Sequence, residues 1–316
     1  MVLGLGKHSS VHSCYACTWA RNTPVTQKQV TKKRTAGSIR KHFEAREEVK
    51  GQARDFFSAV AKPISQLPEG ELIESFVTPP ELHMLLGIFA WLFTVLQKCF
   101  KDPDKIYDWP RHFNIIKSRF YGGGGAYNGN SCRELLRCNT WLLNIITSEF
   151  IKHGMLRDAK AAHEAIARLN SLVSSMFGKP LGLLWKSDHS RFRKSILALF
   201  KFPKLQLKYL TPKLHVLLEH APAWCEKHKC GLGKCSEQSF ETSHHDFKLL
   251  WEQRFKITSL KSPAYKKRLL QAVLTYATQH VPASDALAFL DDIDSAAYDV
   301  ENDEIDREVM SEIINN

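Results

Sequence analysis

Residues 155–177 read MLRDAKAAHEAIARLNSLVSSMF, and this stretch decides the fold class. Apolar residues recur in it at steps of three and four, which is the spacing of one face of an α-helix. The residues on that face are Met155, Ala159, Ala162, Ile166, Leu169, Val173 and Met176. The stretch therefore predicts an amphipathic helix.

Helix signals continue on both sides of this stretch. Thr78-Pro79-Pro80 and Thr211-Pro212 are typical helix starts, because proline suits the first turn of a helix. Apolar clusters of helical length occupy residues 129–152 and 186–202. Met84–Leu96 is an apolar run shorter than the roughly 20 residues that span a bilayer, so it predicts a buried helix. Apart from the N-terminal stretch, no strong alternating pattern predicts a strand.

Other helix boundaries are predicted nearer the ends of the chain. A helix is expected after Ser38, and Ser236 is suited to cap a helix that begins at Glu237. Ser262-Pro263 opens a final long helix. Tyr121-Gly122-Gly123-Gly124-Gly125 predicts a flexible break that divides the helical region into two halves.

Charge is distributed unevenly along the 316 residues. From Asp285 to Glu312 there are eleven acids and one base, a net −10, so residues 1–284 carry +21 of the overall +11. The acidic tail is expected to be disordered or weakly helical. A body this basic suits a polyanion such as nucleic acid, although a solvated basic surface is equally compatible with the charge alone.

The first ten residues show no sustained apolar stretch and no cleavage site, so no secretory signal is predicted. The expected compartment is nuclear or cytoplasmic, and the protein is not expected to be secreted or to enter a membrane. In such compartments cysteines more often bind metal or pack in the core than form disulfides.

Two cysteine and histidine pairs lie far apart in the sequence. Cys14-Tyr-Ala-Cys17 is typical of a zinc half-site, a redox pair or chance, and the βαβ context of a redox pair is absent. His215-Val-Leu-Leu-Glu-His220 has the spacing of the histidines in two-Cys, two-His zinc sites. A five-residue step places these histidines roughly 140° apart on an ideal helix, so one must lie at a helix end or a distortion. Taken alone, the pair favours two ordinary helix histidines.

Two further groups carry metal-binding residue types. Cys225, Cys230 and Cys235 form a competing metal cluster, with His228 among them. Glu237 and Glu241 are four residues apart and share one face of the predicted helix, where their carboxylates are suited to Mg²⁺. Taken alone, the two glutamates favour a capped, solvent-facing acidic turn.

The order of these pieces resembles the catalytic core of Transib-type transposases and of the vertebrate antigen-receptor recombinase. In that family a CxxC half-site, a largely helical insertion, an HxxxxH half-site and a catalytic Glu follow one another. The resemblance covers about residues 1–280. The matching segments are Ser10–Cys17, Pro79–His83, Tyr127–Leu136, His215–His220 with Pro222 close behind, and Gly231–Glu241.

The resemblance implies a structural Zn²⁺ held by Cys14, Cys17, His215 and His220. It implies Glu241 as the catalytic Glu, with Glu237 as the alternative. The implied fold is mainly α, a helical insertion domain plus the last strand and the Glu-bearing helix of an RNase H-like α/β core. The expected domains are a CxxC segment and basic helix at 1–62, the insertion at 63–205, the HxxxxH and catalytic-Glu helices at 206–284, and the acidic tail at 285–316.

The chemistry implied by the resemblance is phosphoryl transfer by two Mg²⁺ ions, which need two Asp and one Glu as ligands. Only thirteen residues precede Cys14, and none of residues 1–54 is Asp. We therefore expect this chain to bind Mg²⁺ only if the missing carboxylates are supplied, and to be inactive alone.

The expected function is that of a transposase-derived protein, catalytically incomplete, with residual nucleic-acid binding. Two alternatives are a C-terminal fragment of an active DDE transposase that cleaves and transfers DNA strands, and a helical scaffold or interaction protein. DNA is the expected partner, and homodimerisation is possible. The predicted nucleic-acid-binding residues are Lys28, Lys32, Lys33, Arg34, Arg40 and Lys41.

Overall fold

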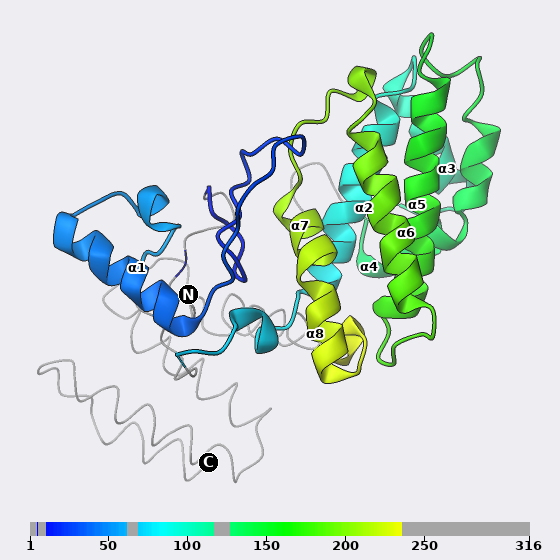
Figure 1. Cartoon of the computed structure of the whole chain (residues 1–316). Helices are drawn as coiled ribbons and strands as arrows, with labels where there is room; N and C mark the ends of the chain where they lie inside the picture. The colour runs from blue at the N-terminus through cyan, green and yellow to red at the C-terminus, as the bar shows by residue number, and fades with distance from the viewer. Residues whose placement is uncertain (1–4, 6–10, 62–68, 117–126, 236–316) are drawn as a thin grey trace, which may run out of the picture. The chain divides into compact units, whose positions relative to one another are not determined.

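The computed structural model describes residues 5, 11–61, 69–116 and 127–235 (Figure 1). All of them belong to one compact unit, Met1–Glu237. This part of the chain is mainly helical, as predicted. The predictions for the glycine-rich break, for the helices after Ser236 and Ser262, and for the acidic tail lie outside the described residues.

The described residues contain eight α-helices and six short 3₁₀ helices. The α-helices are α1 (Ala36–Val49), α2 (Glu81–Gln97), α3 (Asp108–His112), α4 (Gly129–Arg137), α5 (Leu156–Met176), α6 (Trp185–Leu199), α7 (Pro212–Glu219) and α8 (Ala221–His228). The 3₁₀ helices are η1 (Ala53–Phe56), η2 (Ile73–Ser75), η3 (Pro103–Tyr107), η4 (Asn139–Asn144), η5 (Pro203–Leu205) and η6 (Leu232–Cys235).

The helix starts follow the capping signals in the sequence. α7 begins directly after Thr211, whose side chain accepts a hydrogen bond from the backbone N–H of Leu214. α1 begins slightly earlier than predicted, because Thr35 and Ser38 bond to each other's backbone N–H groups. This reciprocal arrangement satisfies two N–H groups that a helix start leaves unpaired.

The apolar cluster predicted as helix at 129–152 is interrupted. α4 ends at Arg137, and η4 follows it. The side-chain amide of Asn139 donates a hydrogen bond of 2.5 Å to the carbonyl oxygen of Leu136. That carbonyl would otherwise serve the helix ladder, so the asparagine competes with continuation of the helix.

The main hydrophobic core lies between α5 and its neighbours. α5 packs against α6, α2 and α4, and its predicted apolar face is buried, with Ala159, Ala162 and Leu169 fully covered. The predicted buried helix is α2, whose Leu85, Ile88 and Leu92 are fully covered. None of the helices in the described ranges is both long and apolar enough to cross a membrane.

The N-terminal part is built differently. Within the described residues the β-structure consists of isolated antiparallel bridges, including Cys17 with Lys33 and Thr35 with Leu72. Two backbone hydrogen bonds, Thr18 N–H to Lys32 and Arg34 N–H to Ala16, flank the first bridge. The CxxC segment is therefore one arm of a short antiparallel pairing. The RNase H-like part of the fold prediction remains a prediction.

Candidate metal centre

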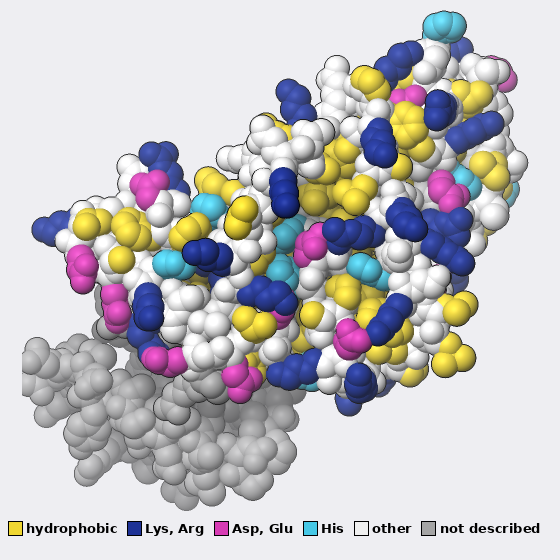
Figure 2. All heavy atoms as spheres, viewed as in Figure 1, with side chains coloured by type: hydrophobic (Ala, Val, Ile, Leu, Met, Phe, Trp, Pro, Cys, Tyr) yellow, Lys and Arg dark blue, Asp and Glu magenta, His cyan; other side chains and the backbone are white. Residues whose placement is uncertain are grey.

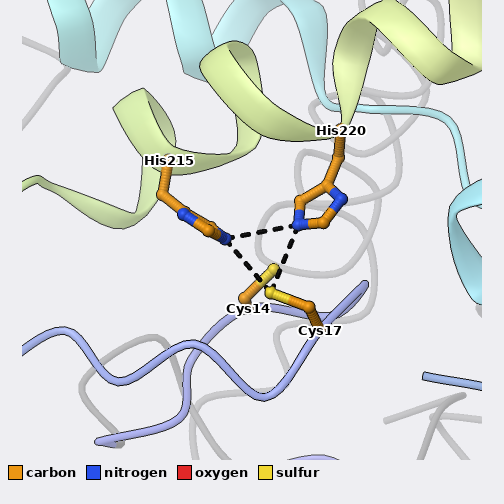
Figure 3. A group of neighbouring side chains, drawn as sticks. All are labelled: Cys14, Cys17, His215 and His220. Atoms are coloured by element: carbon orange, nitrogen blue, oxygen red, sulfur yellow. Dashed lines mark hydrogen bonds between the residues drawn. The ribbon is translucent and has the colours of Figure 1, made fainter. Parts of the chain in front are cut away.

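Cys14, Cys17, His215 and His220 converge on one point (Figure 3). Their ligand atoms all lie within 4.8 Å of one another, and the four residues are at most 4 % exposed. The cysteines come from the N-terminal segment, and the histidines come from α7 and from the residue that follows it. The structure thus brings together two pairs that about 200 residues separate in the sequence.

The distances in the cluster fit a tetrahedral ion. Cys17 Sγ lies 3.2 Å from His215 Nε2 and 3.3 Å from His220 Nε2, and the two Nε2 atoms are 3.2 Å apart. Zinc bonds of about 2.0–2.3 Å in a tetrahedron place their ligand atoms about 3.3–3.8 Å apart. Two thiolates and two imidazoles are also a donor set that Zn²⁺ prefers. The cluster is therefore compatible with a structural zinc site.

His220 lies at a break between helices, as its spacing from His215 requires. It ends α7 and precedes α8, with φ −116° and ψ −36°. The break turns its imidazole back toward His215, which sits inside α7. Pro222 in the first turn of α8 is suited to such a restart, because the first turn does not need its N–H.

The surroundings of the cluster hold two ligands in place. The ring of Trp19 stacks on His215 with centroids 4.3 Å apart and planes 8° from parallel. The backbone N–H of Ala16 donates to Cys14 Sγ at 3.4 Å. The thiols of Cys14 and Cys17 share a hydrogen bond, which lowers the pKa of Cys14 and raises the pKa of Cys17. A metal ion bound here would take both sulfurs as thiolates, so its binding would release protons.

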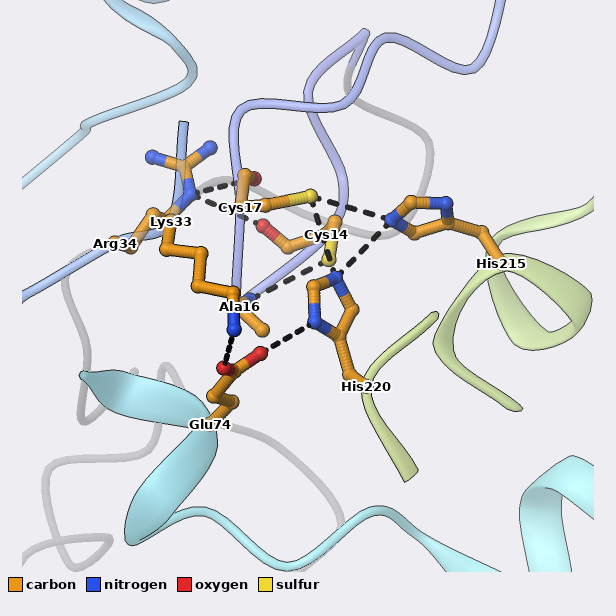
Figure 4. A network of polar contacts seen from close by, with 8 residues as sticks. All are labelled: Cys14, Ala16, Cys17, Lys33, Arg34, Glu74, His215 and His220. Atoms are coloured by element: carbon orange, nitrogen blue, oxygen red, sulfur yellow. Dashed lines mark hydrogen bonds and ion pairs between the residues drawn. The ribbon is translucent and has the colours of Figure 1, made fainter. Parts of the chain in front are cut away.

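Glu74 in η2 forms an outer layer of the site (Figure 4). Its carboxylate is buried, and Oε2 accepts a 2.7 Å hydrogen bond from His220 Nδ1. Oε1 pairs with the ammonium of Lys33. With its proton on Nδ1, His220 presents the lone pair of Nε2 to the cluster. Glu74 therefore fixes the tautomer and the orientation of a metal ligand.

Arg34 overturns one sequence prediction. Its side chain is fully buried, so it does not belong to a nucleic-acid-binding surface. Nε donates to the carbonyl oxygens of Cys14 at 3.2 Å and Cys17 at 2.9 Å, and Nη2 donates to Phe57 at 2.8 Å. Burial lowers the pKa of Arg34, while the neighbouring cysteines raise it. Arg34 clamps the backbone of the CxxC turn (Figure 4).

The other predicted nucleic-acid-binding residues lie nearer the surface. Lys28, Lys32 and Lys41 are exposed. Arg40 is partly exposed and pairs with Glu69. Lys33 is half exposed, but it pairs with Glu74 in the outer layer of the metal centre.

The remaining candidate site residues do not join the cluster. Cys225 and Cys230 are buried and Cys235 is exposed, and within the described part of the chain they form no metal-binding group. Burial raises the pKa of Cys225 to about 12, so its thiol stays protonated. The predicted catalytic residues Glu237 and Glu241 lie outside the described residues.

A cavity of about 500 Å³ borders the metal centre. Three of the four cluster residues contribute to its wall, and the rest of the wall mixes apolar and polar side chains. The wall includes Cys17, His215, His220, Trp19, Val25, Gln27, Thr31, Leu197 and Leu210. The centre thus has a route by which an ion can enter.

Comparison of the chain with models of known protein families and with curated protein sequences finds no significant match. The case for a function therefore rests on the fold and on the geometry of the metal centre.

Proposed function

We propose that this chain is a transposase-derived protein whose zinc-stapled helical body binds DNA. The family it is proposed to join is that of the Transib-type transposases and the vertebrate antigen-receptor recombinase. The observation that carries the proposal is the convergence of Cys14, Cys17, His215 and His220. The resemblance implied that quartet, and the quartet joins the CxxC segment to α7 across the helical region between them.

Zinc has a structural part in this proposal. Two cysteines and two histidines complete a tetrahedral shell, so no position is left for a water or a substrate. The ion would tie the CxxC turn to α7 and close a loop of about 200 residues. The RNase H-like remnant of the proposed fold would comprise the last strand and the helix that carries Glu241.

The DNA-binding part of the proposal rests on charge. Residues 1–284 carry +21, and Lys28, Lys32 and Lys41 are exposed. Such a body binds phosphates without regard to sequence, by releasing counterions from the duplex. Cleavage by two Mg²⁺ ions needs carboxylates beyond Glu241 and Glu237, and no Asp is present among residues 1–54. The proposed activity is therefore DNA binding, with cleavage only where the further carboxylates are supplied.

Metal analysis and DNA titration test the two parts separately. The purified chain should hold about one zinc ion, and Cys14→Ser or His215→Ala should abolish that binding. A duplex should bind at low salt, with an affinity that falls steeply as salt rises. A chain that holds zinc but binds no duplex at low salt contradicts the DNA-binding part. A chain without zinc is better described as a helical scaffold.

A further inference from the structure

The residues from α6 to the start of α7 form a strongly basic segment of the described chain. Residues 186–213 contain eight Lys or Arg residues and one acid, Asp188. Figure 2 shows dark-blue Lys and Arg side chains gathered over the region where Figure 1 draws α6. Five of these bases fall into two groups: two are paired with acids of neighbouring helices, and three are exposed without an ion pair in the described ranges.

The first group faces the neighbouring helices and is neutralised there. Lys186 pairs with Glu226 of α8 at 2.5 Å, and Arg193 pairs with Glu219 of α7 at 2.8 Å. Arg193 also donates to the carbonyl oxygen of Leu218 at 3.0 Å. These two bases hold α6 against α7 and α8, so their charge is already satisfied within the fold.

The second group comprises Arg191, Lys194 and Lys201, which are all exposed. The buried stripe of α6 consists of Phe192, Ile196 and Leu199. At 100° per residue, Arg191 and Lys194 project away from this stripe and lie about 60° apart, and Lys201 follows shortly after Leu199, the last residue of α6. Within the described ranges none of the three forms an ion pair, so their charge is available to a partner.

Positive charge continues past the end of α6. Arg157 of α5 stacks over the ring of Phe202 at 5.9 Å, and Lys204 donates to the carbonyl oxygen of His153 at 3.3 Å. Both side chains therefore stay close to the C-terminal end of the exposed strip. They add to the positive potential there, without an acid partner in the described chain.

We propose that the outer face of α6 at Arg191 and Lys194, together with Lys201 just beyond the end of the helix, contacts the phosphate backbone of duplex DNA. This inference rests on the proposed DNA-binding function and assigns it a surface. From Arg191 to Leu199, the last residue of α6, the strip extends for about 12 Å along the helix axis. About 12 Å of duplex carries about seven phosphate charges, which is more than enough to engage three bases.

The other side chains of this face favour DNA over an acidic protein. Ser187 and Ser190 precede Arg191 on α6, and Ala198 lies between Lys194 and Lys201. Lysine, serine and alanine are depleted in protein–protein interfaces, which favour aromatic residues. Serine hydroxyls and basic side chains are instead common donors to phosphate oxygens.

A matched pair of double variants tests the assignment. Arg191→Gln with Lys194→Gln removes one Arg and one Lys from the strip, and Lys98→Gln with Arg137→Gln removes the same charge from exposed positions at the ends of α2 and α4. Binding of a fluorescein-labelled duplex is measured by anisotropy from about 50 to about 200 mM salt. The slope of log affinity against log salt should become shallower by about 1.8 in the strip variant. In the control variant the slope should stay as in the wild type.

Equal slopes in the two variants overturn the inference while leaving DNA binding intact. Absence of duplex binding by the wild-type chain at low salt contradicts the proposed function itself. Circular dichroism checks that both variants keep their helices. A polyglutamate peptide is titrated in parallel. If the peptide binds the wild-type chain more tightly than the strip variant while the duplex binds both alike, the strip favours an acidic protein and the inference fails.

Discussion

The N-terminal region and the helical region of this protein are held together in different ways. In residues 81–228 the helices share a continuous apolar core, with α5 packed on α2, α4 and α6. The second core cluster is small and consists of Leu5, Ala36, Ile39, Ala59 and Ile73. The CxxC segment reaches the main core through Cys14, Ala16, Cys17 and Trp19, and the side chain of Arg34 also holds its backbone by hydrogen bonds.

This difference predicts which region a bound metal ion would stabilise. Apolar burial of about 25 cal/mol per Å² can stabilise the helices without any ion. The CxxC segment adds Cys14, Ala16, Cys17 and Trp19 to the same core, but residues 11–34 contain no helix, so the bonds from Cys14 and Cys17 to the histidines would be its main anchor. Metal loss should therefore release the first region and spare the second. The following predictions separate the two regions, from the largest effect to the smallest.

The largest effect is expected for Cys17→Ser, which removes a sulfur that lies close to Nε2 of both histidines. Structural zinc contributes apparent binding energies of about 10–16 kcal/mol in zinc-finger peptides, and the variant should lose most of such a contribution. Amides of residues 14–34 should exchange hydrogen much faster, while those of α5 keep their protection. Cys235→Ser, at an exposed cysteine, is the control and should change neither metal content nor exchange.

A substitution in the helical core should lower the stability of the protein without changing its zinc content. Leu169→Ala removes a fully buried side chain from α5 and should lower the free energy of unfolding by about 2–5 kcal/mol. Zinc content of the folded protein should stay the same, because Leu169 is not one of the four residues that offer ligand atoms. Urea unfolding and metal analysis measure the two outcomes, and Lys160→Ala on the exposed face of α5 is the control. Loss of zinc from folded Leu169→Ala would show that the regions are not separable.

Glu74→Gln addresses the outer layer of the centre. The amide keeps the size of the side chain but weakens the bond to His220 Nδ1 and the pairing with Lys33. Zinc affinity should fall about 10- to 100-fold, as is typical when a carboxylate behind a histidine ligand is removed. Competition with a chromophoric chelator measures it. Glu71→Gln, at an exposed carboxylate, should leave the affinity unchanged.

The smallest effect is expected at the start of α7. Thr211→Ala removes the side-chain cap on Leu214 N–H and should cost about 1 kcal/mol of stability. Because His215 lies one turn further along α7, the substitution should also weaken zinc binding slightly. Thr211→Ser restores the hydroxyl and should restore both properties. An unchanged midpoint of urea unfolding for the alanine variant would show that the cap contributes nothing.

The helices and the metal ligands were accessible from the sequence because their signals are local. Apolar periodicity marks α5, proline after threonine marks α7, and each half of the zinc site has its own spacing. A five-residue step on a regular helix separates two side chains by roughly 140°, so the sequence correctly required a helix end or a distortion at His215 or His220. What joined the two halves was the resemblance, since no spacing rule links pairs about 200 residues apart.

Contacts between residues that only the folded structure brings together could not be predicted from the sequence. Glu74 is 146 positions from His220 in the sequence, and no pattern pairs them. Arg34 stands in a run of bases that is typical of a solvated surface. It is nevertheless buried, and backbone carbonyl oxygens, including those of Cys17 and Phe57, accept its hydrogen bonds. The end of α4 depends on one side-chain amide, that of Asn139, which the apolar pattern of 129–152 conceals.

The separation of the two halves of the metal centre has a consequence for how the protein is made. Cys17 and His215 are 198 positions apart. At about 5–20 residues per second, a ribosome needs about 10–40 s to reach the first histidine after the CxxC turn has been synthesised. During that interval the two thiols have no imidazole partners. A nascent chain therefore carries an open, oxidisable half-site until α7 is made, and the proposed zinc ion could close it only after that.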